Sequence, residues 1–360
     1  MHHLHSFHGE PEPGARLSKD WPCTVNEAAD LLKMWYDSDE PFFTKKNLET
    51  VSNQLNRRYN TRSRNDSQKQ LISVRGLGGS KIYYKVLTGQ VLTGEADNQD
   101  WEIQQPKIRY LCYKQLASSV EAGRIGLVEA FFPLQIEHFM LKRASDTKLP
   151  VLDDYIENPV AVDEFLQDTL KSWKQSSEWE NLEALLKLVI THKISKVVGI
   201  ASGSMEYGPD TEDCTMRSAM QHSLMISIKQ SIEESIDQQI QCYAQDPRYT
   251  AVDNWTLAQH GCEVLEDPQA LLEIDDDCVL FSCCPDIPLK EITVDFARPA
   301  MLIWDVVDTD GRRGCHNPDS SRVLKMITDE YDCHEFWDTN EFEEAPFMSE
   351  LVVYIRRKVE

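Results

Sequence analysis

Long hydrophobic runs and an excess of positive charge are both missing from this 360-residue sequence. Lys and Arg number 37 against 60 Asp and Glu, which gives a formal net charge of −23. Phosphate binding depends on basic residues, so bulk charge cannot attract nucleic acid or an anionic membrane to this chain. No apolar stretch approaches the roughly 20 residues that a membrane-spanning helix needs. We therefore expect no membrane association and no nucleic-acid partner held by bulk charge.

Signals for export and for a disulfide framework are also missing. The first residues, Met1 to His5, show no basic segment followed by an apolar stretch, so no signal peptide is visible. The ten cysteines are irregularly spaced and include no C-x-x-C pair. Such cysteines are typical of a reducing compartment, where they act mostly as small buried side chains. The sequence predicts a cytoplasmic and/or nuclear location.

Short apolar runs alternate with helical patterns in the second half of the chain. This alternation is typical of a Rossmann-like, open and mostly parallel sheet with helices on both faces. Ligands of such sheets bind at the carboxyl ends of the strands, near the point where the strand order reverses. The expected strands of the sheet are 197–201, 240–244, 262–265, 278–283 and 300–304.

The length of the chain favours about two domains at roughly 150 residues each. The hydrophobic content of 41% is that of an ordinary globular protein. The sequence predicts an α/β domain preceded by a mixed α+β extension. We divide the chain into a flexible tail at 1–20, the extension at 21–150, the Rossmann-type domain at 151–307, and an acidic excursion with a closing strand at 308–360.

The loop after the first strand of this sheet is rich in small residues. Gly199, Ser202, Gly203 and Ser204 would let backbone N–H groups approach a phosphate or a carboxylate. The loop is not the dinucleotide fingerprint G-x-G-x-x-G, because the second and third glycines are replaced. A tight turn from strand to helix is the alternative interpretation, and the sequence alone favours it slightly.

Asp246 and Pro247 follow the second strand. In Rossmann-like proteins an acidic residue at this place binds ribose hydroxyls, about 20 positions after the glycines of the fingerprint. In this chain Asp246 stands 43 positions after Gly203. Alternatively, Asp246 caps the following turn while Pro247 ends the strand. The sequence supports both interpretations equally.

The fourth strand ends in Cys283-Cys284-Pro285-Asp286. Its end should lie at the same edge of the sheet, where Cys284 or Asp286 could act as a nucleophile or an acid. A reactive thiolate needs an activating neighbour, and the sequence identifies no histidine in that role. Buried small residues and a proline turn are therefore the favoured interpretation.

Two Cys-His dipeptides occur near the C-terminus, and four such ligands could bind zinc. Structural zinc sites usually separate paired ligands by two or more residues, so we expect no metal here. The weak candidates are Cys315, His316, Cys333 and His334.

One stretch of the sequence resembles the "sensitivity to red light reduced" (SRR-like) domain family. It consists of Asp246-Pro-Arg-Tyr249-Thr250, followed by Asp253, Leu257 and Gly261. That family carries a DP-x-[FY]-[ST] stretch after its second strand and a proline turn after its fourth, here at Cys284-Pro285. Pro41-Phe-Phe-Thr44-Lys-Lys46 is similar to the extension of fungal-type members. Where the family often has Pro-His, this chain has Pro285-Asp286.

The resemblance implies a Rossmann-like fold and a regulatory role. Members of the family are linked to light signalling and circadian output in plants and to the regulation of haem biosynthesis in animals. We expect a regulatory or signalling protein that binds a small ligand or a protein partner at the carboxyl ends of the strands. The candidate ligand-binding residues are Gly199, Ser202, Gly203, Ser204, Asp246, Pro247, Tyr249, Thr250, Cys284, Pro285 and Asp286.

An enzyme of the S-adenosylmethionine-dependent methyltransferase type is the alternative. The loop after the first strand and Asp246 at the end of the second strand suit it, and such a fold adds an antiparallel last strand, for which 351–355 is the candidate. S-adenosylmethionine or haem are accordingly the cofactors to consider. The sequence leaves open whether the protein is an enzyme and names no catalytic residue.

Overall fold

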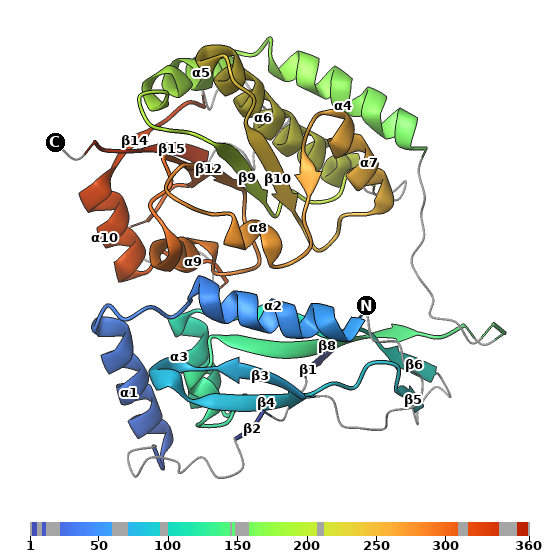
Figure 1. The fold of residues 1–360 in the computed structure, drawn as a ribbon, viewed down its shortest axis with the longest axis vertical. Helices are drawn as coiled ribbons and strands as arrows, with labels where there is room; N and C mark the ends of the chain where they lie inside the picture. Colours follow the sequence, from blue (N-terminus) through green and yellow to red (C-terminus); the bar gives the residue numbers. More distant parts are fainter. Residues whose placement is uncertain are drawn as a thin grey trace. The chain divides into compact units, whose positions relative to one another are not determined.

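In the computed structural model the chain divides into two compact units, Met1–Asp154 and Tyr155–Glu360 (Figure 1). We describe each unit by itself. The structure describes residues 2–5, 9–11, 22–59, 71–93, 100–144, 146–147, 158–206, 212–308, 316–337 and 351–358.

In its described residues, the first unit combines antiparallel sheets with α-helices. Its helices are α1 (Val25–Asp37), α2 (Lys45–Tyr59) and α3 (Tyr113–Glu121). One sheet runs in the order β1 (His2–His5), β8 (Leu134–Lys142), β6 (Asp100–Ile103) and β5 (Val91–Thr93), with β7 (Lys107–Tyr110) also paired to β8. The other runs β2 (Gly9–Pro11), β4 (Lys81–Lys85) and β3 (Leu71–Arg75). Two 3₁₀ turns, η1 and η2, cover Leu77–Gly79 and Glu129–Phe131.

Part of the N-terminal segment is strand, where the sequence predicts a flexible tail. β1 pairs antiparallel with β8, and β2 pairs antiparallel with β4. The composition of 1–20 carries no strand signal of its own. The two strands form instead because the edges of β8 and β4 present backbone N–H and C=O groups with which another segment can pair.

The second unit is built on a seven-stranded sheet with the order β11-β10-β9-β12-β13-β15-β14. Its first five strands in the chain are parallel, and β15 runs antiparallel to both of its neighbours. The predicted α/β fold is therefore confirmed. The strands are β9 (Lys196–Ile200), β10 (Gln241–Gln245), β11 (Glu263–Val264), β12 (Cys278–Ser282), β13 (Met301–Asp305), β14 (Tyr331–His334) and β15 (Leu351–Arg356).

Helices cover both faces of this sheet (Figure 1). One face carries α4 (Pro159–Trp173), α5 (Ser177–Val189), α6 (Glu212–Ile236) and α7 (Ala251–Gln259). The opposite face carries α8 (Gln269–Leu272), α9 (Leu289–Phe296) and α10 (Ser321–Glu330).

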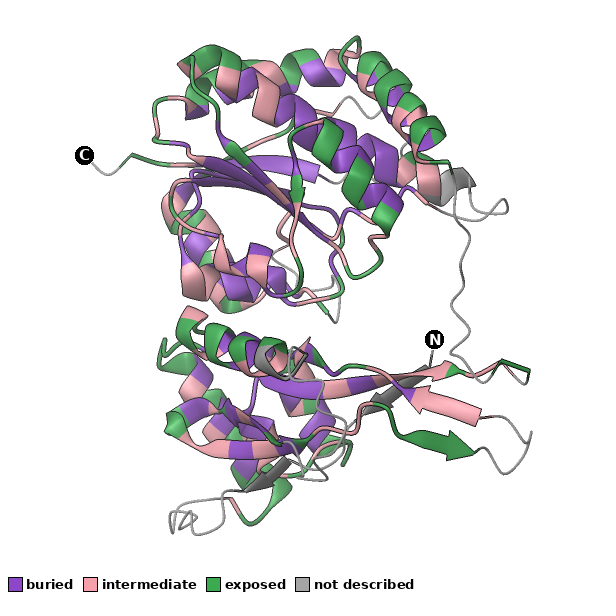
Figure 2. Ribbon diagram, turned by 45° about the vertical axis from the view of Figure 1, so that its right-hand side comes forward, coloured by how far each residue is buried: buried purple, intermediate pink, exposed green. Residues whose placement is uncertain are grey.

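Both faces of the central strands are buried, as Figure 2 shows. All five residues of β9 and all five of β12 are buried. Val279 and Phe281 pack in one cluster with Leu166 and Trp173 of α4, while Leu280 points to the other face. A strand buried on both sides needs a continuous apolar run, which is why these strands were visible in the sequence.

The C-terminal segment contains more structure than the loop or helical excursion that its polar sequence suggests. α10 buries Val323 and Met326, and β14 follows it directly at the edge of the sheet. In β14 only Tyr331 is buried. An edge strand with one buried residue has neither an apolar run nor a clear alternation, so β14 could not be predicted from its residues.

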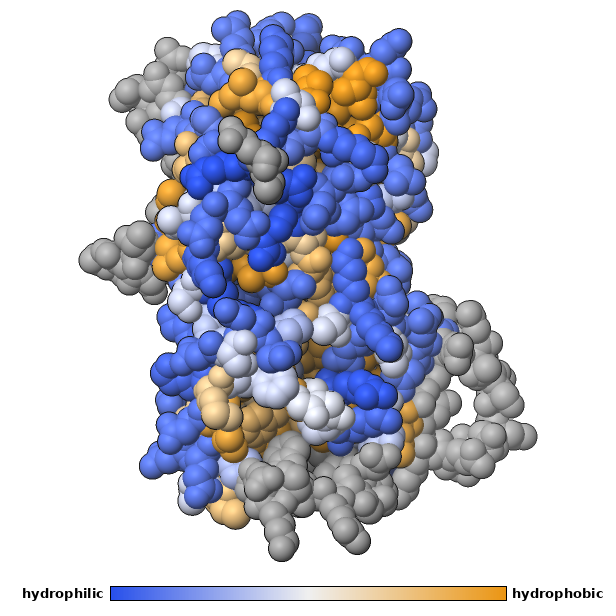
Figure 3. Space-filling model, turned by 60° about the vertical axis from the view of Figure 1, so that its left-hand side comes forward, coloured by the Kyte–Doolittle hydropathy of each residue, from blue (hydrophilic) through white to orange (hydrophobic). Residues whose placement is uncertain are grey.

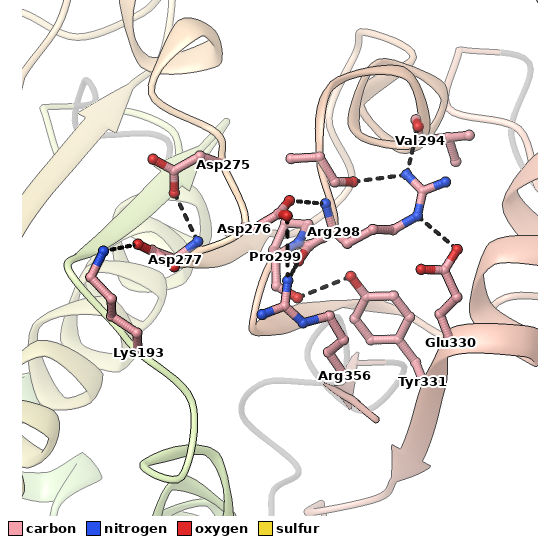
Figure 4. Close-up of polar contacts among 11 residues, drawn as sticks. Lys193, Asp275, Asp276, Asp277, Val294, Arg298, Pro299, Glu330, Tyr331 and Arg356 are labelled. Carbon is pink, nitrogen blue, oxygen red and sulfur yellow. Dashed lines mark hydrogen bonds and ion pairs between the residues drawn. The ribbon is translucent and has the colours of Figure 1, made fainter. Parts of the chain in front are cut away.

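Polar contacts fasten the amino ends of the parallel strands (Figure 4). The Asp276 carboxylate before β12 accepts a 2.7 Å hydrogen bond from the Arg298 backbone N–H before β13. The Arg298 guanidinium donates to Glu330 at 2.8 Å. The Tyr331 hydroxyl donates to the Pro299 carbonyl at 2.9 Å, which attaches β14 to the segment before β13. At this edge of the sheet, charged and polar groups of the chain hydrogen-bond to one another.

The face of the molecule in Figure 3 is largely hydrophilic, with apolar residues in smaller patches. This agrees with the acidic composition. Among the helices that the structure describes, none is both long and apolar enough to cross a membrane.

A buried lysine holds the end of β13 against α9. The Lys290 side chain is fully buried, and its Nζ lies 2.7 Å from Asp305 Oδ2 and 2.5 Å from Asp319 Oδ1. The other Asp319 oxygen accepts a hydrogen bond from the Asp308 backbone N–H at 2.8 Å. One ammonium therefore joins α9, β13 and the segment before α10.

We expect Lys290→Met to lower the free energy of unfolding by about 3–5 kcal/mol, because it leaves two carboxylates with little or no solvent and no cation. Urea unfolding of the full chain measures this. Lys187→Met is the matched control, because Lys187 belongs to an exposed ion pair with Glu183, and its loss should cost no more than about 1 kcal/mol. Equal effects of the two substitutions would show that the buried cluster does not stabilise the fold.

Candidate functional site

The strand order reverses between β9 and β12. From β9 the chain moves to β10 and β11 on one side, and then crosses to β12 and β13 on the other. Segments 201–206, 246–250 and 283–286 follow β9, β10 and β12 and so lie at the carboxyl edge around this switch point, where parallel sheets bind ligands. We call these three segments together with Asp253 the carboxyl-edge site.

The loop after β9 is held by Asp246. The Gly203 backbone N–H donates to Asp246 Oδ2 at 2.8 Å, and the Ala201 N–H donates to the Gln245 carbonyl at 2.9 Å. Ala201 and Gly203 both have positive φ, 61° and 73°. The loop thus turns sharply twice, and its backbone N–H groups point at the end of β10.

Gly199 has a packing role. It lies within β9, and a Cβ added there would overlap Met225 Sδ of α6. The glycine lets α6 approach the sheet closely. The structure places Gly199 within the strand, before the loop to which the sequence analysis assigned it.

A second carboxylate, Asp253 of α7, holds the rest of the loop. It is fully buried and accepts hydrogen bonds from Ser204 Oγ at 2.6 Å and from the Met205 backbone N–H at 2.7 Å. It also accepts from the Thr250 N–H at 2.8 Å, as the N3 residue of a capping box that begins α7. Asp253 belongs to the family pattern in the sequence, but its hydrogen bonds to the loop after β9 were not predicted.

Asp246 has two backbone partners, Gly203 and the Arg248 N–H, each at 2.8 Å. Burial raises the pKa of Asp246 above its ordinary value, while the hydrogen bonds from Arg248 and Gly203 act in the opposite direction. The Arg248 contact is the capping turn that the sequence offered as one alternative. The Gly203 contact shows a further role, which neither alternative contained: Asp246 binds the loop that follows the neighbouring strand β9.

Tyr249 reaches into the face of α6 and meets His222, a residue that the sequence analysis missed. The Tyr249 hydroxyl lies 2.8 Å from His222 Nε2, and His222 Nδ1 lies 2.6 Å from the Ser218 carbonyl oxygen. Because a carbonyl only accepts, Nδ1 carries the proton and Nε2 accepts from Tyr249. No spacing or motif marks His222 within the helix, so only the fold reveals it.

Burial lowers the pKa of His222 to about 4, although the Asp253 carboxylate and the Ser218 carbonyl act in the opposite direction. Burial likewise raises the pKa of Tyr249 well above its ordinary value. Both groups are neutral near pH 7. The carboxyl-edge site therefore includes a hydrogen bond between two neutral side chains, Tyr249 and His222.

The turn after β12 exposes Cys284 and Asp286 and buries Cys283 and Pro285. Cys284 has a φ of 56°, in the left-handed region. A hydrogen bond to Cys284, followed by burial, raises the pKa of the Cys283 thiol well above its ordinary value, while Arg217 of α6 works against both. Cys284, the exposed thiol, and Asp286 are the groups of this turn that solvent reaches.

β9 and β12 are joined at the switch point itself. The buried Ser282 hydroxyl, at the end of β12, donates to the Ile200 carbonyl at 2.8 Å. Sequence reasoning missed Ser282 because a serine at a strand end has no distinguishing pattern.

The Cys-His candidates for a metal site are divided. Cys315 lies outside the described residues. Cys333 and His334 are consecutive residues of β14, so their side chains point to opposite faces of the sheet. Within the described part of the chain, no group of three His, Cys, Asp or Glu side chains is arranged to hold a metal ion.

The arrangement of the carboxyl-edge site limits its chemistry. The N–H groups of Gly203 and Met205 donate to Asp246 and Asp253, which are carboxylates of the chain itself. Two negative groups beside the loop oppose a polyphosphate. The site suits a ligand that offers hydroxyl or amino donors.

The buried histidine should make stability depend on pH. The native His222 imidazole binds a proton near pH 4 and the unfolded one near 6.5, so unfolding takes up a proton between these values. The free energy of unfolding should fall as the pH is lowered from 6.5 to 4, with a slope of up to about 1.4 kcal/mol per pH unit from this residue.

His222→Gln should flatten that slope, as denaturant unfolding at several pH values measures. Burial also lowers the pKa of His138, in the first unit, to about 4. His138 is present in both proteins, so its contribution cancels in the comparison. Identical slopes for the wild type and His222→Gln would contradict a neutral, buried His222.

Asp253→Asn should lower the free energy of unfolding by about 2–4 kcal/mol. Four donors converge on this carboxylate, and an amide must turn its NH₂ toward at least one of them. Urea unfolding provides the measurement. Asp168→Asn, an exposed substitution on α4, should change the stability by no more than about 0.5 kcal/mol. A fully stable Asp253→Asn protein would remove Asp253 from its anchoring role.

Comparison with known proteins identifies the family of this chain. Among solved structures, one match is a Listeria monocytogenes protein assigned to the class I S-adenosylmethionine-dependent methyltransferases. It is 14% identical, the match covers 57% of this chain and 71% of that chain, and the TM-score is 0.29. Comparison with curated proteins gives no match. The model of the SRR1 domain matches residues 166–359, more than half of the sequence. The chain therefore belongs to the SRR1 domain family.

Proposed function

We propose that this chain is a regulatory protein that binds a small ligand or a protein partner at its carboxyl-edge site. The observation that carries the proposal is the position of the site at the switch point, with a loop already fixed by two carboxylates. A loop that is held before binding loses little conformational entropy when a ligand arrives. The proposal includes a cytoplasmic or nuclear location.

The chemistry of the site favours a donor-rich ligand. Asp246 keeps acceptor capacity beyond its two hydrogen bonds, because a carboxylate offers about four lone-pair positions, whereas the fully buried Asp253 already accepts four hydrogen bonds. Asp246 is partly exposed, and Asp286 is exposed in the neighbouring turn. A ligand or partner surface with amino or hydroxyl groups would be matched to these acceptors, and the net charge of −23 would speed its association.

A methyltransferase-like enzyme at the same site is the second candidate. One observation favours it: β15 is the last strand in the chain, runs antiparallel and is inserted between β13 and β14. This is the antiparallel last strand that the methyltransferase alternative requires. Asp246 at the end of the second strand would then turn one oxygen to an adenosyl ribose.

A thermal-shift screen against S-adenosylmethionine, S-adenosylhomocysteine, NAD, ATP and haem tests both candidates. A ligand at one hundred times its Kd adds about 2.7 kcal/mol of stability, which raises the Tm of a domain of this size by roughly 5–10 °C. We expect Asp286→Lys to weaken a shift caused by S-adenosylmethionine, which carries a sulfonium and an amino group, because it reverses a negative charge exposed at the site. Glu183→Lys, on α5, is the matched control and should keep the shift.

The outcomes separate the candidates. A shift with an adenosyl compound that Asp286→Lys reduces would favour the methyltransferase candidate. If none of these compounds shifts the Tm, a pull-down with the wild type, Asp286→Lys and Glu183→Lys identifies a protein partner, which should be lost in Asp286→Lys alone. Ligands and partners that bind all three proteins equally would contradict a role for the carboxyl-edge site.

A further inference from the structure

Two buried cysteines face each other at the edge of the parallel sheet. Cys242 lies in β10 and Cys262 directly before β11, and their exposed fractions are 3% and 2%. Their Sγ atoms are 3.0 Å apart. They are 20 positions apart in the chain, so only the fold brings them together.

The two strands present these residues as direct neighbours. Tyr243 pairs with Glu263 in the parallel ladder, so the preceding residues, Cys242 and Cys262, occupy the next opposed position. Neighbouring strands lie about 4.8 Å apart, within the range of roughly 4.4–6.8 Å that a disulfide spans between Cα atoms. Bond formation requires the sulfurs to approach by about 1 Å, to a length near 2.05 Å.

We propose that Cys242 and Cys262 are a disulfide-forming pair whose oxidant is a low-molecular-weight disulfide such as oxidised glutathione. The Cys262 thiolate attacks one sulfur of the oxidant, which forms a mixed disulfide and releases one thiolate. The Cys242 thiolate then attacks Cys262 Sγ, which forms the intramolecular bond and releases the second thiolate. The two protons lost by the cysteines end on the two released thiols, and two electrons pass from the pair to the oxidant.

The edge of the sheet gives the oxidant a route to the pair. β11 has two residues and ends the strand order. Short edge elements open locally at a lower free energy than central strands. The Cys262 thiol and burial raise the pKa of Cys242, while the nearby Lys229 ammonium lowers it. Because both thiols are buried, oxidation should be slow and should proceed through local opening.

The bond would close a loop that contains segment 246–250 and Asp253 of the carboxyl-edge site. Asp246, Tyr249 and Asp253 all lie between the two cysteines in the chain. A crosslink at the two ends of this segment restricts its local opening. The inference goes beyond the proposed function and does not depend on it, because the bond can be tested without any ligand.

The experiment is equilibration of the folded full chain with oxidised glutathione, followed by acid quenching, alkylation, digestion and mass spectrometry. We expect a crosslinked peptide that joins Cys242 to Cys262 and disappears with dithiothreitol. Hydrogen exchange of residues 246–260 should slow at least several-fold in the oxidised protein. Cys333→Ser, which removes an exposed thiol on β14, should give the same crosslink.

Two results would overturn the proposal. One is that Cys242 and Cys262 stay alkylatable after the exposed cysteines Cys23, Cys284 and Cys333 have formed mixed disulfides with glutathione. The other is that the crosslink forms only in urea. Cys262→Ser must abolish both the crosslink and the slower exchange. If that variant does not fold, the crosslinked peptide of the wild type and its dependence on folding still decide the question.

Discussion

The buried Asp253 carboxylate is the contact on which the carboxyl-edge site depends. It lies in the first turn of α7, where the helix dipole and the capping box with Thr250 stabilise a negative charge. The same oxygens accept from Ser204 and Met205, which belong to the loop after β9. A charge without solvent is tolerated only when hydrogen bonds satisfy it. The loop and the helix start are therefore fixed by one group, and Asp246 repeats this arrangement at Gly203.

This internal use of the backbone N–H groups changes how the loop can work. A glycine-rich loop after the first strand of a parallel sheet commonly presents its N–H groups to phosphate. Here two of them are bound to carboxylates of neighbouring segments. Hydrogen bonds within the fold offset the cost of burying these charges.

The strands buried on both faces could be predicted from the sequence, because burial on both sides demands a continuous apolar run. The start of α7 was also visible, since Thr250 and Asp253 form a local pattern. Contacts across 43 to 49 positions, such as Gly203 with Asp246 and Ser204 with Asp253, left no trace in spacing. β14 and His222 were missed for the same reason: an edge strand and a single buried polar residue depend on neighbours that only the fold supplies.

The exchange of the Gly203 and Met205 backbone amides in the wild-type protein, followed by nuclear magnetic resonance, tests the central claim most directly. If Asp246 and Asp253 hold these amides, both should exchange far more slowly than free loop amides, and added inorganic phosphate should leave their chemical shifts unchanged. Unprotected exchange of the two amides, or a saturable shift with phosphate, would show that the loop is an open anion cradle and would contradict the account.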